Sequence, residues 1–497
     1  MSNNRATFFV LLHNQRSKFF LRFAHYLASL VGHEVIIYSN RHIDLQEQEV
    51  NDKKIHVRSL RYQQLVEMTF TEMLSDQAIS LKNTEKQIGF PFKRVLLTDE
   101  RKAGVAFRNN TWVWFWSPFT RMMAKNPEMA NNLGTAAFKF WQNEIERYNP
   151  KIIFSGSNSG LFNGALFFAA RSKRVKILTN RRSKILDGRY YWTSDWFEQN
   201  TKSLAATKSK IDQKHAPARA SQEFYSNFKQ SPTPVKYIQE NWANAAAPSA
   251  IRRLRTYAGA LKATTLHLIG ITKGDKPVGF LQRLAADISY FINKRFAKRY
   301  FKSFKKEDLL KFRYVYFSMH KEPEVALNQH CPSMHDQSQL VRWVAANLPE
   351  GFDLVVKEHR FNHGRRSPKF YKTLSRLPNV VLVDGYASQY DLIKNSSLVL
   401  AITGSAGYEA MIFERPMIYM GPTFYDFAQN GSRVCSMEEL ASEIFEKLTE
   451  EKESVCSSDF ANLCILHECE TKHTWPEPSE SSGFSCDLEL NSLIAEP

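Results

Sequence analysis

Short apolar runs alternate with helical patterns between residues 314 and 420, and this alternation constrains the fold more than any other feature of the chain. The apolar runs are Tyr314–Ser318, Phe352–Val356, Val380–Val383, Leu398–Ile402 and Pro416–Met420. The stretches between them have helical length and spacing, at residues 337–348, 368–375, 388–395 and 408–413. A continuous apolar run is typical of a strand buried on both faces, and strands joined through helices form a parallel sheet. The pattern predicts a Rossmann-like domain.

The N-terminal half repeats this pattern less regularly. An apolar run at residues 6–13 is followed by a polar loop, a predicted helix at 18–31 and a strand at 32–39. A second unit comprises a strand at 151–154, the loop 155–160, a helix at 161–172 and a strand at 175–178. Two doubly wound α/β domains that face a cleft are therefore predicted, with ligand at the carboxyl ends of the strands.

Composition divides the 497 residues into four parts. The predicted boundaries are an N-terminal Rossmann-like domain at 1–200, a basic helical insertion or linker at 201–310, a C-terminal Rossmann-like domain at 311–453 and an acidic, disordered tail at 454–497. The net charge of +17 conceals +29 in the first 435 residues, because residues 436–497 hold 15 acidic and three basic residues. A positive charge of this size attracts phosphorylated substrates, anionic lipid or nucleic acid.

The cysteine content and the lack of long apolar runs predict a cytoplasmic protein. Only Cys331 precedes residue 435, so a disulfide framework is not expected in the main body. No apolar run approaches the roughly 20 residues that cross a bilayer. The dispersed basic residues come without a recognisable nucleic-acid-binding motif, so no nucleic-acid partner is expected.

Residues 279–306 have the pattern of an amphipathic helix with many basic side chains. Leu281, Leu284, Ile288, Phe291 and Ile292 recur at helical spacing, and Arg283, Lys294, Arg295, Lys298, Arg299 and Lys302 supply the charge. The favoured interpretation is a helix packed on the core with a solvated basic face. The alternative is peripheral attachment to an anionic inner-membrane surface.

The turn after the run at 398–402 is the clearest candidate for a phosphate site. Small residues let a phosphate approach the backbone, and a helix N-terminus offers unpaired N–H groups. The candidate donor contacts here are Thr403, Gly404, Ser405, Ala406, Gly407 and Glu409, with Glu409 placed to reach a ribose. A tight turn with Ser405 as the helix N-cap is the alternative.

Further candidates follow the neighbouring strands. Lys357 and His359, with Arg365 farther along the loop, are candidates for neutralising phosphate charge. His320 and Glu324 combine an imidazole with a carboxylate and are the candidate catalytic acid or base.

The remaining candidates have weaker signals. Tyr386 and Ser388 are placed to hold a nucleotide base, although Ser388 also suits an N-cap. Loops of the N-terminal half offer Asn14, Arg16, Ser157, Asn158 and Arg182 as acceptor-binding residues, and a polar loop without ligand explains each of them equally well.

No metal or cofactor is expected. Cys464, His467 and Cys469 lack the two convincing pairs of a zinc site. Walker, HExxH and EF-hand patterns are not found in the sequence.

Residues 313–425 resemble the capsule polysaccharide biosynthesis family, which includes bacterial Kdo transferases of GT-B architecture. The resemblance rests on six ordered segments, namely Phe317–Glu324, Val356–His359, Leu377–Val380, Asp391–Ile393, Thr403–Ala410 and Arg415–Ile418. It implies a nucleotide sugar, for example a CMP-Kdo-like donor, bound as substrate by the C-terminal domain, with contacts from His359 and the turn 405–409. It also implies transfer to a glycan or lipid-linked glycan without a metal-binding DxD motif. Arg360, Glu322 and Ser405 stand where the family usually has Pro, Gln and Thr.

Three functions remain open at this point. The first is a glycosyltransferase that builds capsular or other surface polysaccharide. The second is a nucleotide-sugar 2-epimerase of the same fold, which needs no acceptor. The third is a non-enzymatic binding protein of polysaccharide assembly.

Overall fold

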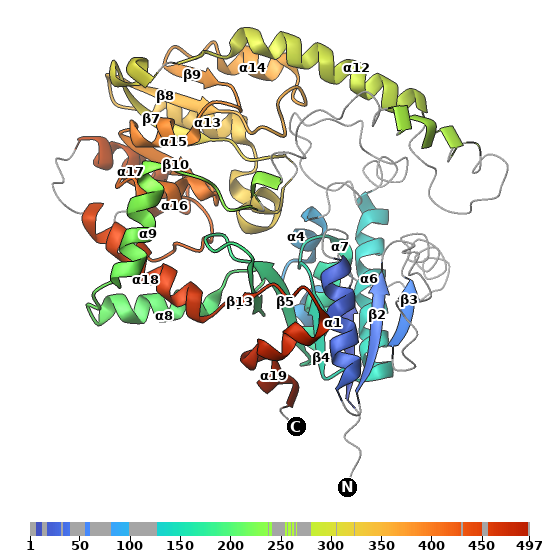
Figure 1. Cartoon of the computed structure of the whole chain (residues 1–497). Coiled ribbons are helices and arrows are strands. Elements are labelled where there is room, and N and C mark those ends of the chain that lie inside the picture. Colours follow the sequence, from blue (N-terminus) through green and yellow to red (C-terminus); the bar gives the residue numbers. More distant parts are fainter. Residues whose placement is uncertain are drawn as a thin grey trace. The chain divides into compact units, whose positions relative to one another are not determined.

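The structure is a computed structural model of the whole chain, and its parts form two compact units. It describes residues 6–11, 17–30, 33–39, 55–59, 81–98, 127–236, 238–240, single positions between 254 and 265, and residues 280–304, 306–322, 324–428, 431–449 and 456–495. Unit 1 comprises residues 1–106, 120–201 and 473–497, and unit 2 comprises residues 107–119 and 202–472. Each unit is built around one sheet (Figure 1).

Unit 1 has a seven-stranded sheet with a Rossmann-like parallel part. The parallel strands are β1 (Thr7–Leu11), β2 (Glu34–Ser39), β3 (Ile55–Ser59), β4 (Ile152–Ser155) and β5 (Lys176–Arg182), in the order β5-β4-β1-β2-β3. Two antiparallel strands, β6 (Arg189–Thr193) and β13 (Trp475–Pro476), extend the edge beside β5. The helices α1 (Ser17–Ser29), α3 (Leu81–Ile88), α4 (Phe92–Leu97), α6 (Pro127–Tyr148) and α7 (Leu161–Ser172) complete the βαβ pattern. The fold predicted for this half is confirmed.

The C-terminal tail folds, which corrects the prediction of disorder after residue 454. Residues 456–472 form α18 in unit 2, and the last residues form a short 3-10 helix, η7 (Ser481–Cys486), and α19 (Leu488–Ala495) in unit 1. Phe484 is fully buried in the core of unit 1. Asp487 accepts hydrogen bonds from the Tyr190 hydroxyl (3.0 Å) and the Trp192 indole (3.2 Å). The acidic composition was misleading because a few apolar side chains and one buried carboxylate suffice to attach the segment.

Unit 2 has a six-stranded, wholly parallel sheet. Its strands are β7 (Arg313–Ser318), β8 (Phe352–Lys357), β9 (Val380–Val383), β10 (Leu398–Ala401), β11 (Met417–Tyr419) and β12 (Gly431–Arg433). The order β12-β11-β10-β7-β8-β9 is that of a doubly wound Rossmann sheet, with the change of direction between β7 and β10. The two Rossmann-like domains predicted from the apolar runs, as in GT-B proteins, are therefore present.

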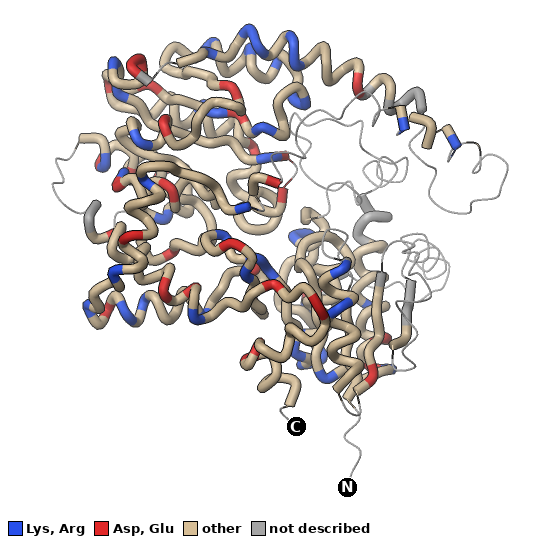
Figure 2. Tube along the Cα trace, in the orientation of Figure 1, with Lys and Arg blue, Asp and Glu red and all other residues tan. Residues whose placement is uncertain are grey.

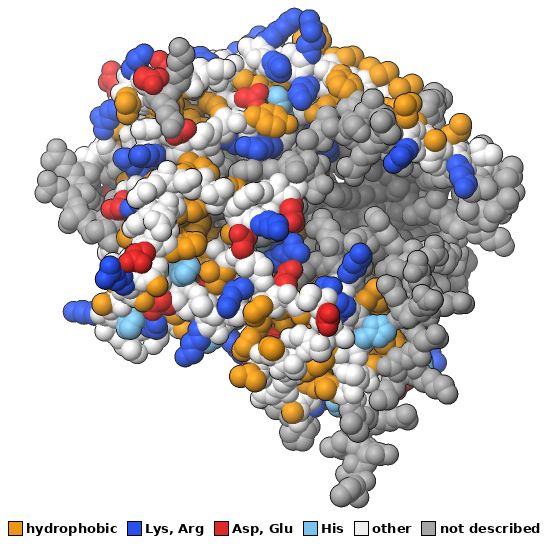
Figure 3. All heavy atoms as spheres, viewed as in Figure 1, with side chains coloured by type: hydrophobic (Ala, Val, Ile, Leu, Met, Phe, Trp, Pro, Cys, Tyr) orange, Lys and Arg blue, Asp and Glu red, His pale blue; other side chains and the backbone are white. Residues whose placement is uncertain are grey.

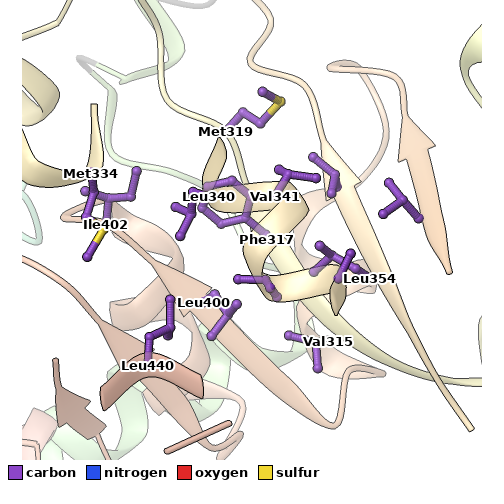
Figure 4. Packing of buried hydrophobic residues seen from close by; sticks show 14 of the residues in the cluster. Val315, Phe317, Met319, Met334, Leu340, Val341, Leu354, Leu400, Ile402 and Leu440 are labelled. Atoms are coloured by element: carbon purple, nitrogen blue, oxygen red, sulfur yellow. The ribbon is translucent and has the colours of Figure 1, made fainter. Parts of the chain in front are cut away.

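The core of unit 2 lies where the sheet meets its helices. Val315, Phe317, Leu354 and Leu400 point from the strands toward Leu340, which lies on α13 (Gln337–Ala346) (Figure 4). The other helices of the sheet are α14 (Pro368–Leu374), α15 (Gln389–Lys394), α16 (Ser405–Ile412) and α17 (Met437–Thr449). Because the strands are buried on both faces, polar side chains concentrate at the strand ends, which is where a ligand site can form.

The described parts of the middle region are helical and belong to unit 2. Its helices are α8 (Thr201–Asp212), α9 (Arg219–Gln230) and α12 (Phe280–Ala297), and a 3-10 turn, η3 (Lys298–Tyr300), continues α12. Helices α9 and α18 contact each other, and α18 contacts α16. Among the described helices, none is long and apolar enough to cross a bilayer.

Candidate functional site

The loops after β7 and β10 meet at the point where the strand order of unit 2 changes direction. A Cβ atom added to Gly404, after β10, would lie 3.2 Å from Cε1 and 3.3 Å from Nε2 of His320, after β7. The crevice at such a switch point is the usual ligand site of an open α/β sheet. His320 and the turn at 403–407, both proposed from the sequence, are thus brought together.

The N-terminus of α16 has no side-chain cap. Gly404 is the N-cap, with φ −81° and ψ 171°, and Ser405 is the first helical residue, so the prediction of Ser405 as N-cap is wrong. The first-turn N–H groups of a helix have no partner within the helix, and a glycine N-cap supplies none. This end of α16 can therefore accept an anion.

A buried hydroxyl next to this turn also lacks a partner. Thr403 is 6% exposed, and among the described atoms its Oγ1 has no hydrogen-bond partner. Its methyl group faces Gly421, where an added Cβ would come within 2.6 Å of Cγ2. An unsatisfied buried hydroxyl costs about 1–3 kcal/mol, which a ligand oxygen or a bound water would remove.

Gly407 and Ala406 shape this turn. The Tyr425 hydroxyl donates to the Gly404 carbonyl oxygen (2.7 Å), and a Cβ at Gly407 would lie 2.6 Å from the same hydroxyl oxygen. Ala406 is buried as well. These contacts give Gly407 a packing role, and its contact with a donor stays a prediction.

His320 and Glu324 form a dyad. Nδ1 of His320 lies 3.2 Å from Oε2 of Glu324. Burial alone would raise the pKa of Glu324, but chiefly the hydrogen bond and the charge of His320 lower this pKa to about 2. In the neutral form of His320, an ionised Glu324 keeps the ring hydrogen on Nδ1, so Nε2, which faces Gly404, is the acceptor. The geometry is that of a base oriented by a carboxylate.

His359 has the opposite tautomer. Its Nδ1 accepts a hydrogen bond from the backbone N–H of Phe361 (3.1 Å), so the neutral ring carries its hydrogen on Nε2. Desolvation lowers the pKa of His359 to about 4, with Glu324 opposing and Lys357 reinforcing the shift. At neutral pH this ring is an uncharged hydrogen-bond donor.

Lys357 and Glu409 are two buried ionisable groups of the same site. The Lys357 ammonium donates to the Gly385 carbonyl oxygen (3.0 Å), and Glu409 accepts from the Gln389 amide. Burial lowers the pKa of Lys357 to about 8 and raises the pKa of Glu409 to about 7, although Glu409 opposes the first shift and Lys357 opposes the second. A carboxyl and an amine that both titrate near neutrality are typical of functional sites.

The raised pKa of Glu409 predicts that Glu409→Gln changes the pH dependence of stability. Because the pKa rises from 4.5 in the unfolded chain to about 7 in the folded protein, the folded state holds its proton more tightly. The free energy of unfolding of the wild type should therefore fall as pH rises between these values, by up to about 3 kcal/mol, and level off above them. Urea unfolding across this pH range should show the decline in the wild type and in the exposed control Glu438→Gln. If Glu409→Gln shows the same decline as the wild type, Glu409 is not the titrating group.

The other predicted donor residues lie on loops after β8 and β9. The Arg365 guanidinium stacks on the Phe361 ring at 3.7 Å, and Tyr386 is 48% exposed. Ser388 is the N-cap of α15, since its hydroxyl accepts from the Asp391 N–H, so the alternative given for it is confirmed. Nucleotide contacts of these three residues remain predictions.

A buried network that could not be predicted from the sequence joins the loops after β7 and β8. The Arg366 guanidinium bonds Glu322 (2.7 Å) and Glu358 (2.9 Å), and the Tyr371 hydroxyl donates to Glu358 (2.8 Å). Gln337 bonds both the N–H and the carbonyl oxygen of His320. No sequence pattern distinguished Arg366 from the other basic residues, whereas Glu322 could have been flagged as a carboxylate in need of a cation.

Three residues proposed as acceptor contacts have internal partners in unit 1. The Ser157 hydroxyl donates to Glu198 (2.8 Å), the Asn158 side chain donates to the Asp195 carbonyl oxygen (2.9 Å), and Arg182 forms a two-pronged ion pair with Glu477. Arg182 lies inside β5 rather than after it, because β5 pairs with β6 as far as Arg182. Asn14 and Arg16 lie outside the described residues. The acceptor role of all five stays a prediction.

The cysteine and histidine of the tail are placed in helix α18. Cys464 and Cys469 are buried, and Nδ1 of His467 lies 3.4 Å from the Ser221 hydroxyl. No group of three or more His, Cys, Asp or Glu side chains able to hold a metal ion is found among the described residues.

Comparison with known proteins identifies the family that the site-bearing segment resembles. Residues 212–431 match the family model described as capsule polysaccharide biosynthesis protein, and this range contains every candidate donor-site residue described above. The family resemblance proposed from six short segments is thereby confirmed. No curated protein matches the chain at a significant level.

Several solved structures align with this chain at low identity and low TM-score. A β-Kdo 2,7 transferase of Thermosulfurimonas dismutans is 12% identical, with 62% of this chain and 80% of that chain covered and a TM-score of 0.28. A glycosyltransferase of Rickettsia africae is 10% identical, with 99% and 100% covered and a TM-score of 0.28. A UDP-GlcNAc 2-epimerase of Neisseria meningitidis is 12% identical, with 94% and 100% covered and a TM-score of 0.24. Similarity this weak transfers no activity, donor or partner to this chain.

Proposed function

We propose that this chain, whose residues 212–431 match the capsule polysaccharide biosynthesis family, is a glycosyltransferase that transfers a sugar from a nucleotide donor to a surface glycan or its lipid-linked precursor. The observation that carries the proposal is the uncapped N-terminus of α16 in contact with the His320–Glu324 dyad at the switch point of the sheet. The helix N-terminus can bind a phosphate, and the dyad can transfer a proton. A transferase needs both in one crevice.

The donor phosphate would lie at the first turn of α16. The N–H groups of Ser405 and Ala406 and the hydroxyl of Thr403 would donate to its oxygens, and the Nε2–H of His359 would add a neutral donor. Glu409, one turn farther along α16, would accept from a ribose hydroxyl. A CMP-Kdo-like donor belongs to this class. No protein-held metal is required in the proposal, because the helix end and Lys357 supply the positive charge.

The reaction forms one bond and breaks one. The acceptor hydroxyl oxygen bonds the anomeric carbon, the bond from that carbon to the phosphate oxygen breaks, and its electron pair leaves with the nucleotide. Nε2 of His320 takes the acceptor proton, and Glu324 stabilises the resulting imidazolium. The helix N-terminus stabilises the charge that develops on the departing phosphate.

A thermal-shift screen against CMP, UDP, GDP and dTDP tests the donor site. One nucleotide should raise the melting temperature of the wild type, because a ligand that binds only the folded state stabilises it. Ser405→Trp, which fills the helix end, and His359→Ala should abolish the shift. The matched controls are Ser442→Trp, at an exposed position of α17, and His25→Ala in unit 1.

The outcomes of the screen separate the three functions. A shift that both site variants lose and both controls keep supports the donor site. If millimolar nucleotide shifts nothing, a non-enzymatic role in polysaccharide assembly is favoured instead. If the protein converts the bound nucleotide sugar without any acceptor to an epimeric nucleotide sugar, it is a 2-epimerase and the transfer step is wrong.

A further inference from the structure

Helix α12 of unit 2 has four large apolar side chains on the side away from the core. Ile288, Phe291, Ile292 and Phe296 are 50%, 49%, 49% and 41% exposed. Relative to Ile288 they lie three, four and eight residues farther along, which puts them on one stripe of the helix. The prediction of a stripe packed on the core is therefore wrong for Ile288, Phe291 and Ile292.

The opposite side of α12 makes the contacts with unit 2. Ala297 is fully buried in the core cluster, and a Cβ at Gly364 would lie 2.8 Å from the Lys294 Cβ and 3.0 Å from the Tyr290 carbonyl oxygen. Gly364 has φ +84°, so the loop passes close to the helix where only glycine is readily accommodated. Helix α12 also contacts α14. The helix is thus attached by its less apolar side, and these close contacts fix its orientation on unit 2.

Basic side chains lie along the same exposed stripe and directly after it. Arg295 is exposed between Phe291 and Phe296, and Lys298 and Arg299 are exposed in η3. Arg299 lies over the Phe296 ring at 4.8 Å. None of the described carboxylates forms an ion pair with Arg295, Lys298 or Arg299. Figure 2 shows this concentration of Lys and Arg along α12, and Figure 3 shows hydrophobic side chains beside them on the same helix.

A soluble protein rarely leaves four large apolar side chains together on one surface without a partner. Exposed apolar residues with cations among and directly after them suit a helix that lies in the interface of an anionic bilayer, because long basic side chains can extend to the headgroups while the apolar side chains lie among the acyl chains. A protein partner of mixed charge would not require cations alone among the apolar side chains. Charge complementarity therefore favours a lipid surface.

We propose that the outer face of α12, formed by Ile288, Phe291, Ile292, Arg295, Phe296, Lys298 and Arg299, binds the surface of a membrane that contains anionic lipid. This inference does not depend on the proposed glycosyl transfer. Binding would occur with the nucleotide site empty, and it would place unit 2 beside lipid-linked molecules.

Flotation of the full-length protein with lipid vesicles tests the proposal. The wild type should float with vesicles of phosphatidylethanolamine and phosphatidylglycerol at low salt, and much less with phosphatidylcholine alone or at high salt. The variant Phe291→Ser/Ile292→Ser removes apolar area, and Arg295→Gln/Lys298→Gln/Arg299→Gln removes three charges. Each should raise the dissociation constant for anionic vesicles at least about tenfold, because one basic residue near an anionic surface contributes a factor of about five in affinity.

Matched controls sit on exposed positions elsewhere. Phe445→Ser removes an exposed aromatic side chain from α17, and Lys208→Gln/Arg342→Gln/Lys394→Gln removes three exposed charges from other helices. Both controls should float like the wild type. All variants should keep the wild-type melting temperature, because the changed side chains are exposed.

Three outcomes would overturn the proposal. The first is a wild type that does not float with anionic vesicles at low salt. The second is flotation that survives both α12 variants or is lost equally in the controls. The third is a wild type that does not bind vesicles but forms a concentration-dependent dimer in sedimentation, with the dimer abolished by Phe291→Ser/Ile292→Ser. That result would assign the face to a second copy of this chain.

Discussion

Replacing Arg366 by methionine should lower the free energy of unfolding of unit 2 by about 3–5 kcal/mol. Arg366 is fully buried and is the cation for two carboxylates, Glu322 and Glu358, which are themselves buried. Methionine fills a similar volume, so the loss would come mainly from two negative charges left without a partner. Urea unfolding followed by far-UV circular dichroism measures the effect.

The matched control is Arg365→Met, one residue earlier. Arg365 is only partly buried and stacks on Phe361, so its replacement should cost less than about 1 kcal/mol. Removing both sides of the strongest pair, in Arg366→Met/Glu322→Gln, should restore part of the stability lost in Arg366→Met. If the two single variants unfold at the same urea concentration, the buried network does not hold this unit together.

The stability lost in Arg366→Met should also depend on pH. Burial raises the pKa of Glu322 while Arg366 opposes that rise, so removing the guanidinium should raise this pKa further. A carboxyl with a raised pKa binds protons more tightly in the folded state, and its penalty disappears as pH falls. The stability difference between wild type and Arg366→Met should therefore shrink in mildly acidic buffer. A difference that grows on acidification would contradict this account.

The parallel sheets could be predicted from the sequence because their strands are buried on both faces. Runs such as Tyr314–Ser318 and Leu398–Ile402 have no polar interruption, and β7 and β10 lie within them. The short strands β3 and β12 were not predicted, since β3 alternates over only five residues and β12 has only three. β6 was missed because its pairing partner, β5, extended into residues that looked like a polar loop.

The candidate site was predicted where it follows from topology and missed where it follows from packing. Polar residues after β7, β8 and β10 must lie at one sheet edge, so the proximity of His320, His359 and the turn at Thr403 could be predicted. Whether a side chain there points to ligand or to protein depends on tertiary neighbours. Ser388 and Gly407 therefore proved to have structural partners, and Arg366 gained its role only through Glu322 and Glu358.

The orientation of α12 on unit 2 could not be predicted from the sequence. Its sequence periodicity correctly predicts an amphipathic helix, but periodicity does not say which face meets the core. The buried contacts of Ala297 and of Lys294 with the Gly364 loop decide that question. An apolar stripe that would ordinarily indicate a core face is here the exposed one, and this reversal is what makes the helix informative about a partner.

Replacing His320 by alanine should lower kcat for glycosyl transfer by about 10²–10⁴-fold, the usual contribution of a general acid or base. The dyad geometry places the acceptor nitrogen Nε2 next to Gly404, at the end of α16 where the donor phosphate is proposed to bind. The thermal shift with the preferred nucleotide should persist in His320→Ala, since the first-turn N–H groups of α16 are untouched. His215→Ala, at an exposed histidine of the same unit, is the matched control and should retain full activity.

Glu324→Gln distinguishes a base that is oriented by a carboxylate from a histidine that only fills space. The variant keeps the size and the hydrogen-bonding capacity of residue 324 but removes the charge that stabilises the imidazolium, so kcat should fall with little change in KM. If His320→Ala leaves kcat intact, or lowers it only by abolishing nucleotide binding, His320 is a binding residue and the base must be sought elsewhere in the chain. Equal losses in His320→Ala and Glu324→Gln, without an additional loss in the double variant, would show that the two side chains act as one catalytic group, because the carboxylate would then act only through the imidazole.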